Sequence, residues 1–90
     1  MLKIKAGFIL KEIAGKFIVV SVGNRVKEFN GIINLNETGV FLWKLLEIGC
    51  DEQSMVNEFL SVYDVDENTA KTDVSKFVAK IKEANLLIEQ

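Results

Sequence analysis

The first part of the chain contains short runs of β-forming residues separated by turn residues. Two of these runs, residues 8–13 and 17–22, are rich in branched aliphatic and aromatic side chains. Ala14 and Gly15 lie between them, and glycine readily takes the positive φ that a tight hairpin requires. Gly23 follows the second run and ends it. The pattern therefore predicts an antiparallel hairpin.

A third run, residues 31–35, follows a polar loop and is shorter than the first two. Side chains alternate between the two faces of a strand, so Ile33 and Leu35 share one face, and Ile32 and Asn34 share the other. We expect this run to complete a three-stranded antiparallel sheet. A short strand at the edge of a sheet leaves backbone groups unpaired, and these groups can accept another strand.

From residue 36 onward the pattern becomes helical. Asn36, Asp51 and Asp66 are each followed by a glutamate, which is typical of a helix N-cap with an acidic first turn. Gly49 and Asn85 tolerate the left-handed conformation that ends a helix. Apolar residues then recur at helical spacing. In the third predicted helix this stripe consists of Ala70, Val74, Phe77, Val78 and Ile81.

The order of elements is β-β-β-α-α-α within one domain, residues 1–90. Three strands cannot bury both faces alone, so the helices must cover one face of the sheet. We expect an α+β fold, winged-helix-like, in which the apolar residues 86–88 fold back onto the core. The balance of 49% hydrophobic and 27% charged residues is that of an ordinary globular domain.

The sequence lacks the residues that most enzymes use. It has no histidine and a single cysteine, Cys50, so histidine-dependent catalytic triads, intramolecular disulfides and two-cysteine metal motifs are excluded. A serine–lysine pair is compatible with the composition, but no motif supports one. Residues 64–68 faintly resemble a calcium loop but lack its glycine and distant glutamate. We therefore expect a protein that is not an enzyme and holds no metal or cofactor.

Nucleic acid is a poor candidate for the partner. The third helix carries four lysines, but Asp73 and Glu83 interrupt them, and Arg25 is the only arginine. Phosphate neutralisation drives affinity for DNA, and the net charge here is −2. Basic residues do outnumber acidic ones in residues 1–35, which fits either an ordinary mixed surface or a region that attracts an acidic partner.

Membrane insertion and export are not expected. No run approaches the 18 apolar residues of a membrane span, and residues 6–10 are too short for the apolar core of a signal peptide. With the unpaired Cys50, this predicts a cytoplasmic protein.

The segment NGIINLNETGVFLW at residues 30–43 resembles the strand-to-helix signature of the PqqD-like family, named for a pyrroloquinoline quinone biosynthesis protein. Its most specific part is LNET at residues 35–38. The resemblance extends over residues 8–88. It departs at Asp51, where threonine is common, and at Asn85, where glycine is common. Supporting matches are FILKEIAG at 8–15, YDVD at 63–66, DV at 73–74 and LL at 86–87.

The resemblance implies a recognition element for ribosomally made, post-translationally modified peptides. Such a domain binds the leader of a precursor peptide and presents it to a modifying enzyme, often a radical S-adenosylmethionine enzyme. The leader adds a strand beside the third strand and lies against the third helix. The peptide-binding residues implied in this chain are Gly31, Ile32, Ile33, Asn34, Leu35, Val74, Phe77, Val78, Lys80 and Ile81.

Several alternatives stay open at this point. The apolar residues of the third helix can simply be core. Lysines on either rim of that helix, Lys76 with Lys80 or Lys71 with Lys82, could steer acidic leader residues. An adaptor of the same fold could instead bind another protein or pair with its own copy as a homodimer.

Overall fold

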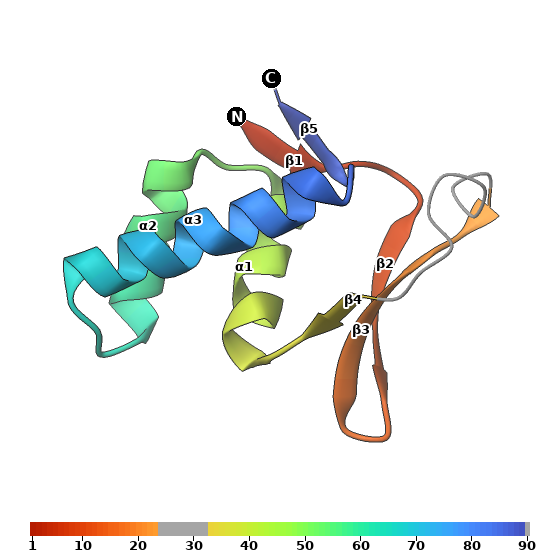
Figure 1. The fold of residues 1–90 in the computed structure, drawn as a ribbon, viewed down its shortest axis with the longest axis horizontal. Coiled ribbons are helices and arrows are strands. Elements are labelled where there is room, and N and C mark those ends of the chain that lie inside the picture. The colour runs from red at the N-terminus through yellow and green to blue at the C-terminus, as the bar shows by residue number, and fades with distance from the viewer. Residues whose placement is uncertain (24–32, 90) are drawn as a thin grey trace.

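The structure, a computed structural model, describes residues 1–23 and 33–89. These residues form an α+β fold in which three strands of one sheet precede three helices, as the sequence predicts (Figure 1). In chain order the elements are β1 (Leu2–Ile4), β2 (Phe8–Ile13), β3 (Lys16–Ser21), β4 (Ile33–Leu35), α1 (Glu37–Ile48), α2 (Glu52–Val62), α3 (Glu67–Glu83) and β5 (Leu87–Glu89).

The predicted hairpin joins β2 to β3. The two strands are antiparallel, and Ile13 lies opposite Lys16 at the closed end. The turn consists of Ala14 and Gly15, which have φ angles of 52° and 78°. Two consecutive positive φ values match the right-handed twist of the flanking strands, which explains why a two-residue loop suffices here.

Strand β4 pairs with β3 on the side away from β2, so the sheet order is β2-β3-β4. The helices cover the β4 side of this sheet, where Val19, Ile33 and Leu35 are buried. The tip of the hairpin extends past the helices (Figure 1), and Ile13 beside its turn is 54% exposed. The helices, which were expected to cover one face of the sheet, therefore cover only part of it, because β2 and β3 are twice as long as β4.

All three predicted helix caps are present. The side-chain Oδ1 atoms of Asn36, Asp51 and Asp66 each accept a hydrogen bond from a backbone N–H three residues later, at 2.8, 2.7 and 2.7 Å. These bonds favour the ionised carboxylate, so they lower the pKa of Asp51 and Asp66 below its ordinary value. At the helix ends, Gly49 and Asn85 have the predicted positive φ, 101° and 63°.

A second, two-stranded sheet was not predicted. Strand β1 pairs antiparallel with β5, which places the two ends of the chain side by side (Figure 1). Leu2 also forms a bridge with Cys50, with N···O distances of 2.8 and 3.0 Å. Strands of three residues carry too little alternation to be recognised in a sequence, and their pairing joins segments more than 80 residues apart. The expected return of residues 86–88 is confirmed by Leu86, which is fully buried.

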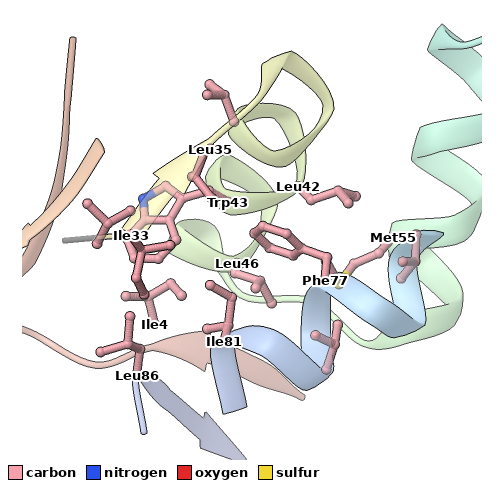
Figure 2. Close-up of a cluster of buried hydrophobic side chains, with 14 of the residues drawn as sticks. Ile4, Ile33, Leu35, Leu42, Trp43, Leu46, Met55, Phe77, Ile81 and Leu86 are labelled. Atoms are coloured by element: carbon pink, nitrogen blue, oxygen red, sulfur yellow. The ribbon is translucent and has the colours of Figure 1, made fainter. Parts of the chain in front are cut away.

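The core lies between β4, the three helices and the small sheet. Figure 2 shows side chains from β1, β4, α1 and α3 meeting around Trp43 and Leu46, both completely buried. Among residues 1–23 and 33–89, no helix combines the length and the hydropathy needed to cross a membrane.

Candidate functional site

The outer edge of β4 presents backbone groups that no strand in the described part of the chain pairs with. In an antiparallel ladder, residues alternate between pairs that exchange hydrogen bonds and pairs that do not. The Val22 N–H donates a hydrogen bond to the Gly7 carbonyl oxygen at 2.8 Å, so these two residues form a hydrogen-bonded pair at the end of the β2–β3 ladder. Every second residue of β3 before Val22 therefore also directs its backbone groups toward β2. By the same alternation, Ile18 directs its backbone groups toward β2. Asn34, opposite Ile18, therefore directs its own N–H and C=O away from the sheet.

A side chain from α3 supports this assignment independently. The Lys80 Nζ donates a hydrogen bond to the Asn34 carbonyl oxygen at 3.3 Å. Because the N–H and C=O of one residue in an extended strand point the same way, the Asn34 N–H also faces α3. Strand β4 thus offers one donor and one acceptor to the space beside α3.

That space is a groove with a volume of about 610 Å³. Its walls are β4, the first turns of α1 and one face of α3. The apolar floor contains Leu42 of α1 and Phe77 of α3 (Figure 2), which are only 2% and 8% exposed. The complete lining is Asn34, Leu35, Asn36, Thr38, Gly39, Leu42, Asp73, Lys76, Phe77 and Lys80.

Gly39 keeps the end of the groove open near the start of α1. A Cβ at this position would lie 3.1 Å from the Asn36 Oδ1 and 3.4 Å from Leu35 side-chain atoms. The same Oδ1 caps the helix by accepting a hydrogen bond from the Gly39 N–H at 2.8 Å. A side chain here would therefore crowd the cap and fill part of the groove.

The structure divides the candidate site residues into three groups. Asn34, Leu35, Phe77 and Lys80 line the groove. Gly31 and Ile32 lie outside the described residues. The others are packed in the core and do not line the groove. They are Ile33, Val74, Val78 and Ile81, with exposures of 9%, 0%, 9% and 0%. Leu35 and Phe77 are equally buried, at 8% each, so position along the groove and not burial separates the two groups.

The structure also distinguishes the two lysine rims of α3. Lys76 and Lys80 line the groove, and neither forms an ion pair with a carboxylate of the described residues. Lys71 pairs with Glu67 at 3.1 Å, and Lys82 pairs with Glu89 at 3.0 Å. The groove thus has a basic rim, whereas the lysines on the other side of the helix are already paired.

Several groove residues were not among the sequence candidates. These residues are Thr38, Gly39 and Leu42 of α1 and Asp73 of α3. The hydrophobic pattern of these helices does not distinguish residues that line the groove from residues that pack in the core. The spacing of Asp73, Lys76 and Lys80 at i, i+3 and i+7 was the available signal, because it places all three on one helical face.

The groove is suited to binding. Within residues 1–23 and 33–89, no three histidine, cysteine or carboxylate side chains are grouped to hold a metal ion. Cys50 lies near β1, outside the groove lining, and burial together with Asp51 and Glu58 raises the pKa of its thiol. The groove instead combines strand-edge groups that no described strand pairs with, an apolar floor and a basic rim, which together suit an extended peptide.

Fold and site together define a small winged-helix-like α+β domain with an open strand edge beside a helix. The chain belongs to the family of coenzyme PQQ synthesis protein D (PqqD), whose sequence profile matches residues 17–87. This confirms the family resemblance seen in the sequence. No curated protein matches the chain in sequence.

Two solved structures share this fold. One is TbiB1 in complex with the TbiA(beta) leader peptide. It is 22% identical, has a TM-score of 0.76, and the alignment covers 98% of this chain and 96% of that chain. The other is lasso peptide synthetase B1 complexed with the leader peptide. It is 16% identical, has a TM-score of 0.75, and the alignment covers 98% of both chains. The likeness extends over nearly the whole length of the three chains compared.

Proposed function

We propose that this protein captures the leader of a ribosomally made precursor peptide by strand addition to β4 and presents it to a modifying enzyme. The observation that supports this most directly is the outward-facing backbone of Asn34 beside a groove with an apolar floor. Membership in the PqqD family and the two structural neighbours, both leader-peptide complexes by name, support the same function.

The energetics make the groove floor decisive for affinity. Each backbone hydrogen bond of an added strand contributes about 0.5–1.5 kcal/mol, while ordering each peptide residue costs about 1–2 kcal/mol. These contributions nearly cancel. Each large apolar side chain that becomes buried adds about 1.5–3 kcal/mol, and micromolar binding requires about −8 kcal/mol. Several apolar anchors must therefore enter the groove and contact Leu35, Leu42 and Phe77.

In this proposal the protein is not catalytic. The modification chemistry belongs to a partner enzyme, for which the family resemblance favours the radical S-adenosylmethionine type. We place the capture step in the cytoplasm, where ribosomes make the precursor and an unpaired thiol such as Cys50 stays reduced.

The groove rim argues against self-pairing through β4. A two-fold symmetric dimer formed at this edge would bring Lys76 and Lys80 of both copies to the same interface. None of these lysines has a carboxylate partner within the described residues, and the only carboxylate in the groove lining is Asp73. The resulting repulsion between like charges favours a peptide over a second copy.

The test is a backbone amide NMR titration of the ¹⁵N-labelled protein with candidate leader peptides taken from adjacent genes. We expect chemical shift changes at Asn34, Leu35 and the groove face of α3 around Phe77. The amides of Lys71 and Lys82, on the other side of α3, serve as internal controls. A well-folded spectrum that does not change at high peptide concentration would contradict leader capture.

A further inference from the structure

Lys80 occupies the acceptor that strand addition requires. Its Nζ lies 3.3 Å from the Asn34 carbonyl oxygen, and this bond joins residues 46 positions apart. An amide nitrogen in a β-ladder approaches the same kind of oxygen to about 2.9 Å. An incoming peptide must therefore bring its own N–H to the oxygen that the Lys80 ammonium already contacts, so the two donors compete for this acceptor.

Within the described residues, the groove offers the displaced ammonium no carboxylate close to Asn34. Of the described residues, Asp73 is the only acidic one in the lining, and it lies seven residues earlier on α3, about 10 Å along the helix axis. Lys76 lies between them and adds a second positive charge. A ligand that carries its own carboxylate resolves this, because it offers the ammonium a partner as the peptide backbone replaces it.

We propose that Lys80 is a displaceable cap on the open edge of β4, and that it selects peptides with an aspartate or glutamate next to the residue that pairs with Asn34. The inference rests on the proposed function, since it concerns the specificity of the same groove. Lys80 thereby disfavours neutral strands, which take over the Asn34 carbonyl oxygen but offer the displaced ammonium no new partner.

The fold also indicates where the acidic residue lies in the peptide. Residues directly opposite each other in a sheet place their side chains on the same face. The peptide residue opposite Asn34 therefore points to the same face as Asn34, away from the core. Its two neighbours point toward the core face, where Ile33 and Leu35 are buried and where α3 presents Lys80. The acidic side chain belongs at one of these two neighbouring positions.

The experiment is an mRNA-display selection of random ten-residue peptides against three immobilised proteins: wild type, Lys80→Met and Lys71→Met. Lys71→Met is the matched control, because it removes a lysine from the same helix that pairs with Glu67 outside the groove. We expect acidic residues to be enriched at one aligned position with the wild type and Lys71→Met, and not with Lys80→Met.

A selected peptide and its Glu→Gln counterpart then provide the quantitative test, measured by fluorescence anisotropy. Wild type should prefer the glutamate peptide about two- to fivefold, the range of an exposed ion pair. Lys80→Met should lose this preference and bind the glutamine peptide more tightly than wild type does, because the cap is gone. Loss of folding cannot produce this improvement.

The outcomes separate this inference from the function on which it rests. Enrichment of peptides without an acidic position, or an equal Glu-to-Gln affinity ratio in wild type and Lys80→Met, overturns the role of Lys80 and leaves strand addition standing. A selection that enriches no peptide on any of the three folded proteins overturns peptide capture itself, and the Lys80 inference with it.

Discussion

Replacing Asn34 by proline tests strand addition at the residue of β4 whose backbone groups face the groove. Proline has no backbone N–H, and the Asn34 N–H points into the groove rather than toward β3. The substitution therefore removes no hydrogen bond from the sheet. The preceding residue, Ile33, already lies in a strand, which is the conformation that a following proline favours. We expect the variant to fold.

The expected loss of affinity follows from the one missing donor. A peptide carbonyl placed opposite proline loses its hydrogen bond and stays partly desolvated, which costs about 1–3 kcal/mol. This corresponds to a Kd roughly fivefold to 150-fold higher, since about 1.4 kcal/mol is a factor of ten.

Glu12→Pro provides the matched control on the opposite edge of the sheet. Glu12 lies opposite Phe17, which by the ladder alternation directs its backbone groups toward β4. The Glu12 N–H therefore also points away from the sheet, at the outer edge of β2. Both variants place proline at an edge donor that no strand of the described residues pairs with, and only one of these edges borders the groove.

The assay is fluorescence anisotropy with a labelled leader peptide, after circular dichroism has shown that both variants are folded. We expect Glu12→Pro to bind like wild type and Asn34→Pro to bind within the weaker range given above. A folded Asn34→Pro variant with wild-type affinity would refute strand addition at β4. Equal weakening by both variants would refute it too, because the effect would not depend on the groove edge.

Two further predictions concern residues outside the groove, the core residue Ile81 and the helix-capping residue Asp66. Ile81→Val should lower the free energy of unfolding, measured by urea denaturation, by about 0.5–1.5 kcal/mol, because Ile81 is completely buried. The Kd of the folded variant for the leader peptide should stay the same, and a changed Kd would place Ile81 in the binding site. Asp66→Asn should keep the helix cap but flatten the acid dependence of thermal stability. The hydrogen bond from the Thr69 backbone N–H lowers the pKa of Asp66, so the ionised carboxylate stabilises the fold above about pH 4 and this stabilisation is lost as the pH falls through the folded-state pKa. Melting temperatures that fall equally steeply with decreasing pH in both proteins would contradict this.

Local chemistry in the sequence determined most of the secondary structure. The caps at Asn36, Asp51 and Asp66 each act on a backbone group three residues away, and the hairpin turn involves two adjacent residues. Such interactions depend on neighbours along the chain, so spacing and residue type are sufficient to predict them. The alternation of β4 likewise placed Ile33 and Leu35 in the core and Asn34 outside it.

Only the tertiary structure decided which residues of α3 face the groove. Apolar residues at helical spacing share one stripe whether they pack in the core or line its border, so the pattern alone does not separate Ile81 from Phe77. The basic rim and the Lys80–Asn34 bond depend on how α3 lies against β4, across 46 residues of sequence. The pairing of β1 with β5 is decided in the same way, because it links the two ends of the chain through contacts that no local pattern encodes.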